Sequence, residues 1–148
     1  MTLKTIAAAG LAALALSSLP AHAREWQVKM LNKGANGAPM QFEPAFLAIR
    51  PGDTVKFLAT DKGHNAEIIA GMLPAGAAPF KGRINQEIVV GFAKPGLYGY
   101  KCLPHLGMGM VGLIQVGPAV NKPQVMAEAA RLPGFAKRTM AGLLARAR

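Results

Sequence analysis

The residues best suited to chemistry are concentrated in one short segment. Cys102, His105 and Met110 follow one another as C-x2-H-x4-M, and His64 stands 38 residues before the cysteine. A thiolate, two imidazoles and a thioether form the ligand set of a type 1 copper site, because soft sulfur suits Cu(I) and imidazole suits both oxidation states. The pattern therefore predicts a site for one copper ion that cycles between Cu(II) and Cu(I).

Each of these residues has an ordinary explanation when it is considered alone. A histidine in a turn, such as His64, is usually solvated, and a buried cysteine is often only a small apolar side chain. Met110 and Met108 could both fill gaps in a core. Zinc is the nearest competing metal, because a cysteine with two histidines occurs in catalytic zinc sites. Zinc does not need a thioether, however, so the combination favours copper.

The same residues favour an electron carrier over an enzyme. The sequence offers no carboxylate pair, no nucleophile beside a base and no second metal motif, and hydrolytic or transfer reactions need such groups. A copper chaperone or storage protein is the main alternative, although such proteins generally hold Cu(I) in clusters rich in Met or Cys. A zinc-dependent hydrolase would need an open metal position, which Met110 would fill.

The first 23 residues have the layout of a secretory signal peptide. Lys4 precedes an apolar run of 11 residues, 6–16, and the segment ends in Ala21-His22-Ala23, a typical cleavage site. The run is shorter than the roughly 20 residues that span a bilayer. We therefore expect cleavage after Ala23 and a soluble periplasmic protein without membrane insertion. An exported chain with the single thiol of Cys102 is unusual, which is consistent with a metal on that sulfur.

Length and composition limit the remaining possibilities. The chain has 148 residues and a formal net charge of +10 at pH 7, with 17 Lys and Arg against 7 Asp and Glu. A chain of this length forms one domain, and 51% hydrophobic residues exclude global disorder. Nucleic acid is excluded as a partner, because the sequence has no recognition motif and no set of base-stacking aromatic residues.

Residues 24–118 are expected to form the domain that positions the ligands. Short runs of alternating or apolar residues are separated by turns rich in Gly, Pro and Asn, which is typical of an antiparallel β-sandwich or barrel. The predicted strands are 26–30, 46–49, 54–60, 67–70, 86–92, 97–102 and 111–116. His64 then falls in a turn after the third strand, and Cys102 falls at the end of the sixth.

Residues 119–148 are expected to form a helical extension on the same domain. Two short helices are predicted, 123–131 and 134–148, with Pro133-Gly134 between them. Apolar residues recur at helical spacing in the second, namely Ala136, Met140, Leu143, Leu144 and Ala147. A helix pair packed on the sandwich is favoured over a membrane-surface helix, which needs a bulkier apolar face.

Several motifs resemble the cupredoxins, and within them the pseudoazurin group. They include Met30-Leu31-Asn32-Lys33-Gly34, Phe42-Glu43-Pro44, Pro51-Gly52-Asp53-Thr54-Val55, Asp61-Lys62-Gly63-His64-Asn65 and the run from Lys101 to Gly112. The resemblance covers nearly all of residues 24–148. It implies a mainly β, Greek-key β-sandwich with two C-terminal helices, and copper at one end on His64, Cys102, His105 and Met110.

The resemblance also implies roles for the residues around the ligands. Asn65 would tie the two ligand loops together, and Pro104 would affect the thiolate because proline has no N–H to donate. Electrons would leave through an apolar patch that includes Met40, Pro44, Pro104, Leu106 and Met108. Leu106 departs from the group, which often has an aromatic residue there.

A basic rim around the patch is expected to attract an acidic partner. The matching lysines are Lys33, Lys62, Lys81 and Lys101. The resemblance implies a monomer that accepts electrons from a c-type cytochrome or a similar donor. It would pass them to copper nitrite reductase or another periplasmic reductase of denitrification.

Overall fold

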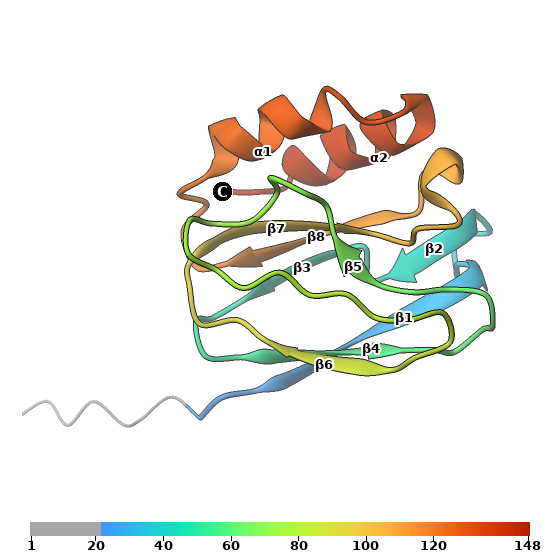
Figure 1. Ribbon diagram of the computed structural model, residues 1–148, viewed down its shortest axis with the longest axis horizontal. Helices are drawn as coiled ribbons and strands as arrows, with labels where there is room; N and C mark the ends of the chain where they lie inside the picture. Colours follow the sequence, from blue (N-terminus) through green and yellow to red (C-terminus); the bar gives the residue numbers. More distant parts are fainter. Residues whose placement is uncertain (1–21) are drawn as a thin grey trace, which may run out of the picture.

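The structure, a computed structural model, describes residues 22–148 and consists of two β-sheets and two C-terminal helices (Figure 1). The predicted signal peptide, residues 1–23, lies outside the described residues except for its last two. The strands are β1 (Glu25–Lys33), β2 (Pro39–Glu43), β3 (Phe46–Ile49), β4 (Thr54–Leu58), β5 (Glu67–Ile68), β6 (Ile88–Gly91), β7 (Gly96–Lys101) and β8 (Val111–Val116). A short 3-10 turn, η1 (Leu106–Met108), precedes β8, and helices α1 (Lys122–Ala129) and α2 (Gly134–Leu144) follow it.

The strands form two four-stranded sheets, in the orders β2-β1-β4-β6 and β3-β8-β7-β5. The expected antiparallel pairing holds for four of the strand pairs, whereas β1 pairs with β4 in parallel and β3 pairs with β8 in parallel. In both cases the chain crosses to the other sheet between the paired strands. When it comes back, β4 lies parallel to β1, and β8 lies parallel to β3. Both sheets are therefore mixed, and the mainly β class is confirmed.

Strand alternation decides which side chains of β7 face the space between the sheets. Tyr98, Tyr100 and Cys102 belong to the main core cluster, whereas Leu97 belongs to a second cluster beneath the helices. Successive side chains of a strand point to opposite faces, so the two tyrosines and the cysteine share the inner face. The cysteine thus continues the buried row of β7 just beyond the end of the strand.

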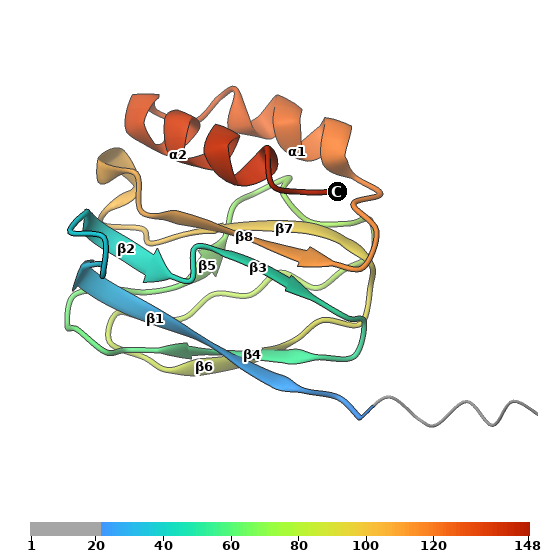
Figure 2. The ribbon, with the colours of Figure 1, turned by 180° about the vertical axis from the view of Figure 1, so that it is seen from behind.

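Helices α1 and α2 cover the outer face of the β3-β8-β7-β5 sheet (Figures 1 and 2). All five predicted apolar positions of the second helical segment are buried, and Ala136 and Met140 are fully buried. The packing confirms the predicted pair of helices, although α2 ends at Leu144 rather than at the chain terminus. One sheet is therefore covered on both faces, and the ligand-bearing β7–β8 connection lies beside α2.

The strand predictions were right in number and place except for β2. Its sequence, PMQFE, follows a Gly- and Asn-rich turn, and only Phe42 in it is buried. Met40 has a positive φ of 50°, which interrupts a regular extended pattern. Short strands with one buried residue leave little alternation to detect, so the segment looked like a continuation of the loop.

Tyr100 and Gly112 form a close contact across β7 and β8. The two residues are paired in register, and a Cβ placed on Gly112 would lie 2.1 Å from the Tyr100 ring. The ring also packs edge-on against Phe42 and Phe57, at centroid distances of 4.7 and 5.1 Å. Only glycine fits opposite this ring, so the pair fills the core two residues before Cys102.

We expect Gly112→Ala to lower the free energy of unfolding by about 1–3 kcal/mol, since an added methyl group overpacks a filled core. Urea denaturation of the metal-free protein would measure the change. Gly142→Ala is the matched control, because a Cβ there meets nothing within 4 Å, and it should stabilise α2 by about 0.5–1 kcal/mol. Equal effects of the two variants would contradict the packing argument.

Candidate metal centre

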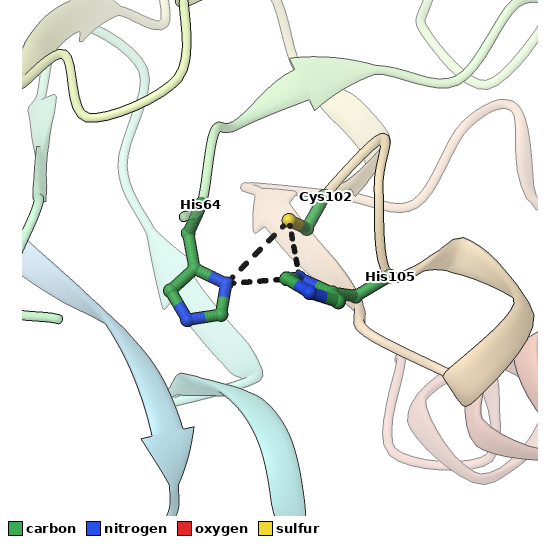
Figure 3. A group of neighbouring side chains, drawn as sticks. All are labelled: His64, Cys102 and His105. Atoms are coloured by element: carbon green, nitrogen blue, oxygen red, sulfur yellow. Dashed lines mark hydrogen bonds between the residues drawn. The ribbon is translucent and has the colours of Figure 1, made fainter. Parts of the chain in front are cut away.

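Two connections at one end of the sandwich bring the three strongest candidate ligands together (Figure 3). His64 lies between β4 and β5, whereas Cys102 and His105 lie between β7 and β8. His64 and Cys102 are fully buried, and His105 is half-buried. Their imidazole and thiol groups point toward one another, as the sequence pattern predicts.

The three donor atoms form a triangle that fits a metal ion. His64 Nδ1 lies 3.7 Å from Cys102 Sγ, His105 Nδ1 lies 3.4 Å from that sulfur, and the two nitrogens are 3.1 Å apart. A point inside this triangle lies about 2 Å from all three atoms, close to the bond lengths of about 2.0–2.3 Å that imidazole and thiolate make to zinc, another first-row metal. The donor set and its spacing therefore fit one copper ion.

The ring of His64 is oriented from behind by Asn32. His64 Nε2 lies 2.8 Å from Asn32 Oδ1, and an amide oxygen can only accept a hydrogen bond, so Nε2 carries the proton. The other nitrogen, Nδ1, then presents its lone pair to the centre of the triangle. Asn32 is itself held by Asp61, whose Oδ2 accepts the Asn32 backbone N–H at 2.7 Å. Such contacts to the far nitrogen commonly fix a metal-binding histidine.

Met110 stands at the base of the same loop. Its carbonyl accepts the N–H of Cys102 at 3.0 Å, and its own N–H donates to His105 O at 3.2 Å. Its side chain is buried within the main core cluster. The backbone contacts hold Met110 beside Cys102 and His105, and its role as the fourth ligand stays a prediction.

Asn65 connects the two ligand loops. Its Oδ1 accepts the N–H of Leu103 at 2.7 Å, and its Nδ2 donates to Gly82 O at 3.1 Å and to Glu67 Oε2 at 3.0 Å. Its backbone N–H also acts to lower the pKa of the Cys102 thiol. The side chain is buried, so these contacts are shielded from water. The structure thus places Asn65 where a residue joining the loops must be.

The surroundings favour the neutral forms of Cys102 and His64 in the metal-free protein. Burial raises the pKa of the Cys102 thiol, an effect that the N–H groups of Asn65 and His105 oppose. Burial and the neighbouring His105 both lower the pKa of His64. A metal must therefore displace the thiol proton, whereas His64 is already in its ligating form at neutral pH.

The apolar surface at this end differs in part from the predicted patch. Pro44, Pro104 and Met108 are exposed, whereas Met40 packs partly against the main core and Leu106 against the cluster under the helices. Two exposed apolar residues were missed, Leu103 and Ile84, at 51% and 47% exposure. Leu103 lies between the predicted site residues Cys102 and Pro104, and this position in the sequence could have predicted that it belongs to the surface.

Ile84 lies in a segment tied to the centre through its neighbour Asn85. The N–H of Asn85 donates to His64 O at 2.8 Å, and its Oδ1 accepts the N–H of Gly63 at 2.7 Å. No spacing rule links residues 84 and 64, so sequence reasoning had no signal for Ile84. The apolar surface at the centre therefore includes a third segment of the chain.

Three of the four predicted lysines are exposed, namely Lys33, Lys62 and Lys81. Lys101 differs, because its side chain is only 21% exposed and its Nζ lies 3.5 Å from Glu67 Oε1. It is therefore half of an internal ion pair as well as a member of the predicted rim.

A two-sheet β-sandwich with a Cys–His–His centre between strand connections defines the class of protein: this is a cupredoxin fold with a candidate mononuclear copper centre. Comparison with known proteins agrees. Residues 28–117 match the family model for copper binding proteins of the plastocyanin/azurin family.

Individual relatives are similar over most of the chain. It is 48% identical to pseudoazurin from Paracoccus pantotrophus over 141 residues, 95% of each chain, and 55% identical to pseudoazurin from Methylorubrum extorquens over 112 residues, 76% of this chain and 75% of that one. The crystal structure of pseudoazurin from Hyphomicrobium denitrificans is similar with a TM-score of 0.79 and 45% identity, covering 84% of this chain and 98% of that one. The chain therefore belongs to the plastocyanin/azurin family and, within it, to the pseudoazurins. The predicted copper cofactor is confirmed at the level of this family.

The lowered pKa of His64 predicts how the stability of the metal-free protein depends on pH. The unfolded chain binds the proton more readily than the folded one, so this contribution is fully present above the ordinary pKa of 6.5 and is lost as the pH falls below it. We expect the free energy of unfolding, measured in urea, to decrease between about pH 7.5 and pH 5.5. His64→Gln should flatten this dependence, and an equal slope in both proteins would contradict the assignment.

Proposed function

We propose that the protein is a periplasmic electron carrier that passes single electrons from a c-type cytochrome or similar donor to a denitrification reductase such as copper nitrite reductase. The observation that carries the proposal is the triangle formed by His64 Nδ1, Cys102 Sγ and His105 Nδ1, with sides of 3.1 to 3.7 Å. Membership of the pseudoazurins, which are electron carriers rather than enzymes, supports it.

A bound copper ion supplies one-electron chemistry, since both Cu(I) and Cu(II) accept thiolate and imidazole ligands. The protein's part is to hold these ligands still, so that little rearranges when the electron moves. Asn32 fixes the His64 ring, and the backbone N–H groups of Asn65 and His105 favour the thiolate form of Cys102. Pro104 lies between Cys102 and His105, and because proline has no N–H it adds no further donor near the sulfur.

His105 is the proposed exit for the electron. It is half-buried, in contrast to the fully buried His64 and Cys102. Its loop carries the exposed residues Leu103, Pro104 and Met108, which give the ligand an apolar surrounding. An apolar contact excludes water at a transient interface, and a small apolar area keeps the complex short-lived.

The exposed lysines support an acidic partner. Lys62 lies two residues before His64, and Lys33 follows Asn32, which contacts that ligand. Charges of one sign around a docking patch raise the encounter rate and lose their effect with added salt. A basic rim of this kind suits a reductase with an acidic surface.

The periplasmic location rests on the sequence of residues 1–23, with cleavage proposed after Ala23. Within residues 22–148, no helix has the length and apolar character needed to cross a membrane. A monomer is proposed because a carrier must expose the His105 patch to a donor and an acceptor in turn.

A visible absorption spectrum tests the centre directly. We expect the Cu(II)-loaded protein to show an intense thiolate-to-copper band that bleaches with ascorbate and returns on oxidation, because the Cys102 thiolate is a ligand. Cys102→Ser should lose the band while keeping the fold. A colourless protein that still binds copper would favour the chaperone or storage alternative instead.

Replacing an exposed apolar residue tests the docking surface. We expect Met108→Asp to slow electron transfer to an acidic reductase by about tenfold at low salt, because the new carboxylate repels the partner, with no change in the absorption spectrum. Val120→Asp is the matched control, since Val120 is 65% exposed and follows β8, which runs away from the ligand loop. Stopped-flow kinetics would measure both rates, and an equal slowing would disprove the assigned surface.

A further inference from the structure

Glu67 is a buried acid close to the candidate metal centre. Its residue exposure is 7%, and it lies in β5, three residues after His64. Burial of a carboxylate without compensation is strongly unfavourable, so an acid at this position needs a partner. Burial is the main cause of the raised pKa of Cys102, and the negative charge of Glu67 raises it further. Glu67 therefore acts electrostatically on the Cys102 sulfur.

The Glu67 carboxylate contacts both segments that carry ligands. One oxygen, Oε2, accepts from Asn65 Nδ2 at 3.0 Å, and Asn65 in turn accepts the N–H of Leu103. The other oxygen, Oε1, lies 3.5 Å from the Nζ of Lys101, the residue before Cys102. The two residues are also directly opposite in the β5–β7 register. Glu67 is therefore held between the residue that follows His64 and the residue that precedes Cys102.

Lys101 makes this interior contact and is also partly exposed at the surface. Its side chain is 21% exposed, whereas that of Glu67 is 9% exposed. Lys81, which is exposed, forms a backbone bridge with Glu67 and so lies close to the pair. A partner carboxylate can compete for Lys101, but the buried Glu67 cannot follow it.

We propose that the Glu67–Lys101 ion pair links docking of an acidic partner to the reducing strength of the copper centre. This inference rests on the electron-carrier function proposed above. An acidic surface that draws Lys101 outward removes the counter-charge of Glu67, and the uncompensated carboxylate stabilises the oxidised centre relative to the reduced one. One electron then leaves the reduced centre more readily, and the acceptor gains it.

Reduction potentials of the copper-loaded full chain, measured by voltammetry, test the pair. Glu67→Gln keeps an oxygen acceptor for Asn65 and removes the charge, so the potential should rise. Lys101→Gln should lower it. Each change corresponds to about a tenfold shift in the ratio of oxidised to reduced protein at a fixed solution potential. The double variant, which removes both charges, should return close to the wild type.

Lys62→Gln is the matched control, because it removes one exposed lysine at the same end of the molecule. Its effect should be much smaller, since solvent screens an exposed charge. Equal shifts for Lys62→Gln and Lys101→Gln would overturn the inference. If Lys101→Gln does not fold, Glu67→Gln and the double variant still give the effect of each charge.

Hexaglutamate at low salt serves as the acidic probe of docking. The potential of the wild type should fall on its addition, and that of Glu67→Gln should fall distinctly less, because no carboxylate is then left uncompensated. An identical fall in both proteins overturns the coupling and leaves the electron-carrier function intact. A copper-loaded wild type without any reversible wave overturns the proposed function and the inference together.

Discussion

The copper end of this molecule depends on one joint between two distant parts of the chain, and the side chain of Asn65 makes it. Its oxygen accepts the N–H of Leu103, 38 residues further on, while its Nδ2 donates to Glu67 and to Gly82 O beside the His64 loop. A metal held by ligands from two loops is only as well placed as the loops are relative to each other. A buried amide is suited to this task, because its donors and acceptor act in fixed directions and without competition from water.

The rest of the fold serves that joint in two different ways. The inner face of β7 carries Tyr98 and Tyr100 into the core and leaves Cys102 as the last member of the row. The helices press on the opposite face of the same sheet, and Leu106 of the ligand loop packs into their cluster. The strand thus fixes where the sulfur is, while α2 supports the far side of the loop that carries His105. Rigidity at the centre is a property of both sheets and of the helix layer above them.

The sequence was sufficient to predict the cluster of His64, Cys102 and His105 and most of the fold, since residue type and alternation carry that information. The row that ends at Cys102 follows from period-two burial, and the spacing of His105 and Met110 places them in one turn. The sequence could not predict the contacts that orient the ligands. Asn32 reaches His64 because β1 and β4 run in parallel, a pairing that alternation does not specify. Glu67 looked like an ordinary strand residue, and only the register with Lys101 shows that it is enclosed.

The parallel pairing of β3 with β8 has a consequence for how the molecule is assembled. Strand β3 is made early in synthesis, but its neighbour in the sheet is the last strand of the chain, and β7 also needs β8 as its partner. His64 therefore exists long before the loop that completes its site, and that loop cannot close until residue 116 has been made. Contacts between such remote segments form late and slowly. Loading of the metal must then be an event of the finished chain, and a newly made chain held open before folding has a lone thiol with nothing yet to protect it.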